Sequence, residues 1–88
     1  MSGIGQLKSD VTRNKSQISS IEGEISTERQ KLNNNALSQA ERGGIETLIQ
    51  DLETKKAQYE EANNTIRAEI NELEQQREQQ LKQQNKEN

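Results

Sequence analysis

The sequence predicts an all-α fold: an antiparallel helical hairpin in which two helices pair as a coiled coil, and which can assemble into a dimer or a larger helical bundle. Two long stretches carry apolar residues at alternating steps of three and four, the spacing that coiled-coil helices require. The segment between them contains Asn33, Asn34 and Asn35, and consecutive Asn residues have low helix propensity. The pattern therefore indicates a helix, a turn and a second helix.

The composition limits how much surface the chain can bury. The chain has 88 residues, of which 26% are hydrophobic, and Tyr59 is its one aromatic residue. So few apolar side chains cannot fill a globular core of ordinary thickness, but they suffice for a thin seam between two helices. The charged fraction of 31% is also typical of disordered chains, and the sustained periodicity argues against disorder.

The first helix is predicted over residues 4–34, after a flexible N-terminus at residues 1–3. Nine consecutive slots of one heptad frame run through this stretch, and seven of them are aliphatic. Asn14 and Glu28 occupy the other two slots. The aliphatic slots are Ile4, Leu7, Val11, Ile18, Ile21, Ile25 and Leu32.

The heptad frames of the two stretches do not join. Leu32 and Ile49 occupy the same heptad position but lie 17 residues apart, two heptads plus three, so a continuous helix would need an overwound coil here. A turn at residues 35–37 avoids that strain, because Asn tolerates left-handed backbone conformations. Ser38 and Glu41 then match a capping box, which opens a new helix. A continuous rod is the alternative to the hairpin.

The second helix is predicted over residues 38–84, with a Gln- and Glu-rich overhang after residue 73 and a flexible C-terminus at residues 85–88. Its frame again has nine slots, seven of them apolar, with Lys56 and Asn63 in the gaps. The apolar slots are Ile45, Ile49, Leu52, Tyr59, Ile66, Ile70 and Leu73.

One antiparallel register lets both apolar stripes begin and end together. It places Ile4 opposite Leu73 and Asn14 opposite Asn63. The two interior amides can then satisfy each other, which fixes the register at a cost in stability. Neighbouring registers place Asn63 against aliphatic residues, and we reject them for that reason.

Charged residues flank both stripes in a broadly complementary way. Basic residues beside the first stripe face glutamates beside the second, although Glu22 and Arg67 break the pattern. Each exposed pair would contribute only a few tenths of a kcal/mol. The complementary residues are Lys8, Lys15 and Arg29 on the first helix and Glu46, Glu53, Glu60 and Glu74 on the second.

The residue inventory argues against catalysis and cofactors. The chain has no Cys and no His, which removes thiolate zinc ligands, the commonest metal ligand and the commonest general base. Neighbouring carboxylates such as Glu60 and Glu61 need a cleft that shifts their pKa values, and a two-helix surface offers none. We therefore expect no enzyme, no cofactor, no metal site and no small-molecule substrate.

Charge and hydropathy narrow the class of partner. The net charge is -3 and the Lys and Arg residues are scattered singly, so no nucleic-acid partner is expected. No apolar run approaches the roughly 18 to 20 residues that a membrane span needs, so no membrane partner is expected either. The N-terminus lacks the apolar stretch of a secretory signal. We expect a cytoplasmic protein, and export by a route without a cleaved signal stays open.

These observations favour a non-enzymatic coiled-coil module that acts through helix–helix contacts, with a helical protein partner or with itself as a homo-oligomer. A thin seam leaves an isolated hairpin marginally stable, since every ordered residue costs conformational entropy. A second helical surface would supply the missing burial. The candidates for this contact are apolar residues off the seam: Leu37, Leu48, Ala57, Ala62 and Ala68.

The size of the chain suggests an alternative hypothesis about its function. The chain is similar in size to the helical-hairpin proteins of bacterial secretion systems, but the Trp-x-Gly motif typical of one such group is absent from this Trp-free sequence. The alternative function is a small acidic chaperone or accessory protein of such a system, which would shield the helix of a client along the second helix and its overhang. The chain could also be a segment of a longer coiled coil.

Overall fold

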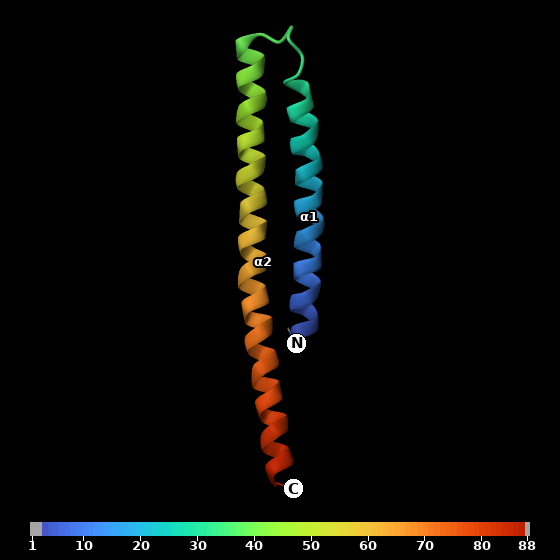
Figure 1. Ribbon diagram of the computed structural model, residues 1–88, viewed down its shortest axis with the longest axis vertical. Coiled ribbons are helices and arrows are strands. Elements are labelled where there is room, and N and C mark those ends of the chain that lie inside the picture. The colour runs from blue at the N-terminus through green and yellow to red at the C-terminus, as the bar shows by residue number, and fades with distance from the viewer. Residues whose placement is uncertain (1–2, 88) are drawn as a thin grey trace.

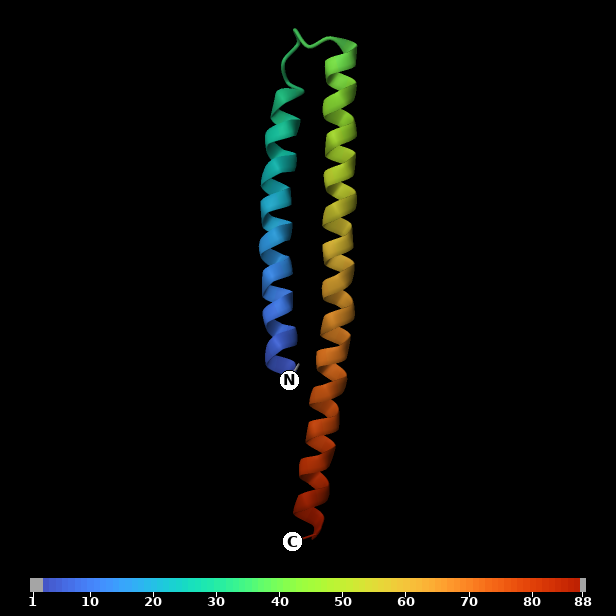
Figure 2. The ribbon, with the colours of Figure 1, turned by 180° about the vertical axis from the view of Figure 1, so that it is seen from behind.

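Two helices of unequal length lie side by side and run in opposite directions (Figure 1). The computed structural model describes the backbone of residues 3–87 and the side chains of residues 3–84. Helix α1 spans Ile4–Lys31 and helix α2 spans Gln39–Glu87. The hairpin measures 77 × 20 × 14 Å, and both views show α2 continuing well beyond the start of α1 (Figures 1 and 2). The predicted all-α helical hairpin is confirmed.

The buried surface follows the two heptad stripes. All eighteen seam slots, polar ones included, are buried or half-buried. Outside the seam, the only half-buried residues within 3–84 are Gly3, Asp10, Leu37 and Arg42, and the others are exposed. The core is therefore one side chain thick, as expected when only a stripe of each helix is apolar. Its most deeply buried apolar residues are Val11, Ile21, Ile25, Ile49, Leu52 and Ile70.

The register is the one predicted from the two interior Asn residues. Asn14 Nδ2 donates a hydrogen bond of 2.9 Å to Asn63 Oδ1. Asn63 Nδ2 in turn donates to the backbone carbonyl of Val11 at 3.3 Å. Asn63 is 1% exposed. Both the oxygen and the nitrogen of its side-chain amide have partners inside the hairpin, which offsets the cost of burying a polar group.

The turn between the helices forms by a different route from the predicted one. Within residues 3–87 no residue has a positive φ, so the Asn run does not use the left-handed region. Instead α1 tightens: Leu32, Asn33 and Asn34 donate their backbone N–H groups to carbonyls three residues earlier. The Asn34 side chain then accepts a 2.9 Å bond from the N–H of Ala36. Asn here acts through its side chain, which mimics a backbone turn.

The helix ends differ from their predicted positions. Helix α1 ends at Lys31 rather than at residue 34, because the tightened turn begins at Leu32. Helix α2 continues to Glu87 instead of ending at residue 84, since Gln, Lys and Glu are strong helix formers and no Pro or Gly interrupts them. Residues 1, 2 and 88, for which we predicted flexible ends, lie outside the described residues.

The start of α2 is held by the predicted capping box. The N–H of Glu41 donates to Ser38 Oγ at 3.0 Å, and the N–H of Ser38 donates to Glu41 Oε1 at 3.1 Å. The backbone bond from Ser38, together with the nearby Ser38 hydroxyl, holds the pKa of Glu41 below its usual value. The stability gained from this carboxylate is therefore present at neutral pH and is lost as the pH falls through the lowered pKa.

Replacing Ser38 with alanine tests this cap. We expect Ser38→Ala to lower the free energy of unfolding by about 1 kcal/mol, because it leaves an N–H at the start of α2 without its side-chain acceptor. Urea denaturation followed by circular dichroism measures the change. Ser16→Ala, an exposed position inside α1, is the matched control and should change stability by no more than about 0.5 kcal/mol. Equal effects of the two substitutions would contradict the role of Ser38.

Candidate interaction surfaces

The helix pair leaves two long flanks, and each is hollowed between the helices. On one flank three large apolar side chains gather near the turn among polar and charged ones, and on the other flank the lining side chains are mainly charged. We call the first the apolar groove, lined by Leu37, Ile45, Leu48 and Leu52. We call the second the charged groove, which runs along the flank marked by Lys15 and Glu22 of α1 and by Glu60 and Arg67 of α2.

The apolar groove begins at the turn and extends along α1. Near the turn Leu37, Ile45 and Leu48 line one hollow together with Gly44, whose missing side chain keeps it open. Further along, Leu48 and Leu52 face small residues of α1, among them Gly23. Leu48 is 44% exposed, and exposed large aliphatic side chains in a concave surface are typical of protein-binding sites.

Four charged residues line the rim of the apolar groove, and one ion pair forms among them. Lys31 Nζ lies 2.7 Å from Glu28 Oε2, and the Glu28 side chain is only 13% exposed. This pair explains how Glu28 occupies a seam slot: its carboxylate reaches Lys31 one turn away while its stem covers the seam. Glu24 and Glu41 also line the groove and take part in none of the ion pairs found within residues 3–84, so the rim presents a net negative charge to a partner.

The five residues predicted for a partner contact do not lie on one surface. Leu37 and Leu48 line the apolar groove together. Ala62 is exposed and lies on the same side of α2 as Leu48, because 14 residues are close to four helical turns. Ala57 and Ala68 are exposed as well, but nine and twenty residues from Leu48 place them on the opposite side of the helix.

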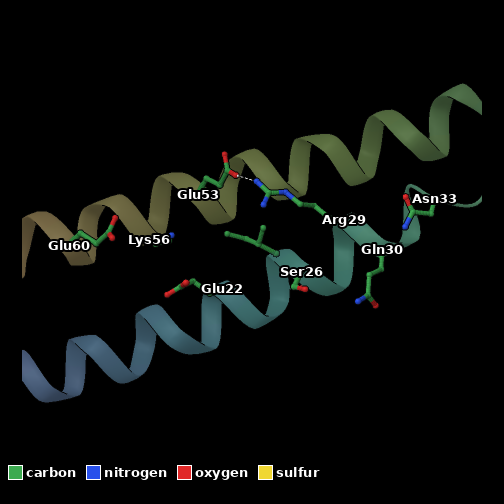
Figure 3. A pocket seen from close by; sticks show the side chains of 9 residues that line it. Glu22, Ser26, Arg29, Gln30, Asn33, Glu53, Lys56 and Glu60 are labelled. Carbon is green, nitrogen blue, oxygen red and sulfur yellow. Dashed lines mark hydrogen bonds and ion pairs between the residues drawn. The ribbon is translucent and has the colours of Figure 1, made fainter.

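The charged groove follows the other flank over most of the length of α1. Its floor is the seam, including Ile18 and Ile25, and its walls are charged residues of both helices. Figure 3 shows the part nearest the turn, with Glu22 and Arg29 projecting from α1 and Glu53 and Glu60 from α2.

Two ion pairs close the charged groove near its ends. Arg29 bonds Glu53, and Lys8 Nζ lies 3.6 Å from Glu74 Oε2. These are two of the complementary contacts predicted from the flanking charges. All four side chains are about half exposed or more, so each pair adds no more than about 1 kcal/mol. The remaining residues of the same prediction take part in none of the ion pairs found within residues 3–84: Lys15, Glu46 and Glu60.

Between these ion pairs the same groove carries two pairs of like charges. Lys15 and Arg67 line it side by side, and one heptad further along Glu22 and Glu60 do so. Among the ion pairs found within residues 3–84, none includes any of these four residues. Lys56 lines the acidic part and offsets some of its charge. The middle of the groove therefore has a basic half and an acidic half.

The sequence pattern singles out two of the like-charge residues of the charged groove but does not identify the groove as a surface. Glu22 and Arg67 stood out as exceptions to a complementary flank. The signal that could have revealed the surface is that both exceptions fall in adjacent heptads on the same flank. Exceptions so arranged create a charge gradient along the helix pair.

Comparisons with protein-family models, curated proteins and solved structures find no match to this chain. Within the described range of 3–87, neither helix contains a stretch long and apolar enough to cross a membrane. In the same part of the chain, no three acidic residues converge in a way that could hold a metal ion. The apolar groove and the charged groove are therefore the basis for inferring the function.

Proposed function

We propose that this protein is a non-enzymatic interaction module that binds a helical segment of a protein partner in its apolar groove. The observation that carries the proposal is the grouping of Leu37, Ile45 and Leu48 in one hollow beside the turn. Leu48 is one of two large apolar residues that are exposed within residues 3–84. An amphipathic helix buries such residues by laying its own apolar face into the groove.

The dimensions of the groove suit a short helix. The residues of α1 that line it run from Ser20 to Lys31, which is about 16 Å at 1.5 Å per residue. Three turns of a partner helix span this length, so apolar residues at successive turns can reach the groove. Gly23 and Gly44 add no side chains to its walls, which lets the partner backbone approach closely.

The alternative function, a small acidic chaperone or accessory protein of a secretion system, would use the α2 overhang as a docking face. Leu81 is the large apolar residue of that overhang and is 54% exposed. A single leucine offers a client far less apolar area than the grouped residues of the groove, and burial of apolar area is the main source of such affinity. We therefore favour the groove.

Peptide titration tests the proposal. The probe is a synthetic amphipathic helical peptide with leucines on one face, and its control is a peptide of the same composition with the leucines dispersed. We expect binding of the first peptide to shift the NMR signals of Leu37, Ile45 and Leu48. Leu48→Glu should weaken this binding about tenfold or more, since burying one leucine is worth roughly 1.5–3 kcal/mol.

Leu81→Glu is the matched control, because it adds the same charge at the other exposed leucine. It should leave peptide affinity unchanged. Signal shifts confined to the overhang, together with a loss of binding in Leu81→Glu, would favour the chaperone hypothesis. Equal affinity for both peptides, or an unchanged affinity of Leu48→Glu, would rule out the apolar groove as the binding surface.

A further inference from the structure

The two like-charge pairs of the charged groove are electrostatically unfavourable within a single hairpin. Lys15 lines the groove with Arg67, and Glu22 with Glu60, and like charges in such positions repel each other. Exchanging the signs of one residue in each pair would give four complementary layers on this flank. The arrangement costs stability in the single chain, and contacts with opposite charges from outside the chain would offset that cost.

We propose that the charged groove is a docking surface for a second copy of this chain, placed by a twofold axis that crosses the groove between the two like-charge pairs. The basic half of each copy then faces the acidic half of the other. Lys15 of one copy meets Glu22 of its partner, and Arg67 meets Glu60. The middle of the surface is therefore self-complementary, as a twofold interface requires.

The direction of the axis follows from the charges. An axis parallel to the helices would bring each like-charge pair against itself and double the repulsion. An axis that lies in the interface and runs across the helices reverses their direction and exchanges the two halves. The halves are seven residues apart, about 10 Å along a helix, so the axis passes about 5 Å from each. The result is an antiparallel four-helix arrangement.

The remaining charges on this flank do not oppose that arrangement strongly. Beyond the two halves lie the ion pairs of Lys8 with Glu74 and of Arg29 with Glu53. In this arrangement Lys8 faces the partner's Arg29, and Glu74 faces the partner's Glu53, so like charges meet in the outer layers. Each of these residues is already paired with an opposite charge of its own chain, so their net repulsion is smaller than the attraction between the two unpaired halves. Lys56 reduces the charge of the acidic half without reversing it, because two glutamates face it.

The size of the surface also suits a dimer. Helix α1 has 28 residues, about 42 Å, and the hairpin is 20 Å across. A face of that length and width has a projected area of about 800 Å², which is comparable to the area that each partner contributes to a typical stable interface. The residues next to the groove, such as Ser26 and Asn64, have short uncharged side chains and do not hold the two copies apart.

Sedimentation equilibrium of the full chain and of charge-reversed variants tests the proposal. We expect a dimer at low ionic strength that dissociates as salt is added, because contacts between exposed charges are screened over roughly 8–10 Å. Lys15→Glu with Arg67→Glu makes both halves acidic, and Glu22→Lys with Glu60→Lys makes both halves basic. Each double variant alone should raise the dimer dissociation constant on the order of tenfold or more.

Mixing the two double variants should restore a dimer, since the acidic halves of one chain then face the basic halves of the other. Arg77→Glu with Lys82→Glu changes the net charge as much as the first double variant but lies on the overhang, and should dimerise like the wild type. A wild-type chain that stays monomeric at low salt would overturn the proposal. So would double variants that dimerise as well as the wild type, or a mixture that stays monomeric although circular dichroism shows both chains folded.

This inference does not depend on the proposed function. The charged groove and Leu48 lie on opposite flanks of the helix pair. Reversing the charges should therefore leave peptide binding in the apolar groove unchanged, and Leu48→Glu should leave the dimer unchanged. Each experiment can fail without the other.

Discussion

Replacing Ile25 with alanine is expected to lower the free energy of unfolding by about 2–5 kcal/mol. Ile25 is 5% exposed and packs in a cluster with Ile21, Ile49 and Leu52. The substitution removes buried apolar surface and leaves a cavity that two helices can only partly close. Small domains have total stabilities of only several kcal/mol, so a loss of this size unfolds a large share of the molecules. Urea denaturation followed by circular dichroism measures the effect.

Leu81→Ala is the matched control for this prediction. Leu81 is an aliphatic residue of the same helical pair but is 54% exposed and lies on the overhang of α2, so its truncation should change stability by no more than about 0.5 kcal/mol. If Ile25→Ala and Leu81→Ala have similar effects, the seam is not the source of stability.

Asn63→Ala is expected to lower the free energy of unfolding by roughly 1–3 kcal/mol. The substitution removes the acceptor for Asn14 and the donor to the carbonyl of Val11. Both groups then stay inside the hairpin without these partners, and an unsatisfied polar group costs its full desolvation penalty. The adjacent Asn64 is exposed, so Asn64→Ala should be nearly neutral in the same urea titration.

A double variant separates the stability of the Asn pair from its role in register. Replacing both Asn14 and Asn63 with leucine removes both polar groups, and we expect stability equal to or above that of the wild type. We also expect looser specificity, because a seam without the Asn pair accepts registers one heptad apart. Doubled NMR signals from seam residues would report the extra registers. A double variant with single signals and lower stability would contradict this role of the pair.

The seam was predictable because it depends on periodicity alone. Apolar residues at steps of three and four place one stripe on each helix, and the stripes specify which residues are buried. The register was predictable for a more particular reason: Asn14 and Asn63 each carry a cost in an aliphatic environment, and one register pairs them. Ser38 and Glu41 likewise specify the start of α2 through a local pattern.

The remaining features depend on contacts that a linear pattern does not contain. The turn tightens before the Asn run because backbone bonds form at Leu32, and propensity alone does not locate them. The apolar groove depends on how close Leu37 in the turn comes to Leu48 on α2. The charged groove depends on which charges face each other across the seam, and this follows from the sequence only when the two stripes are placed in register.

Through-space NMR contacts of the Asn14 side chain test the hairpin most directly, in the unmodified protein. A uniformly labelled sample is compared with a mixture of labelled and unlabelled chains, in which only contacts between chains are selected. We predict a contact between the side-chain amides of Asn14 and Asn63 in the first sample and its absence from the selected spectrum of the second. A contact between these two residues in the selected spectrum of the mixture would contradict the hairpin. So would the absence of this contact from the uniformly labelled sample.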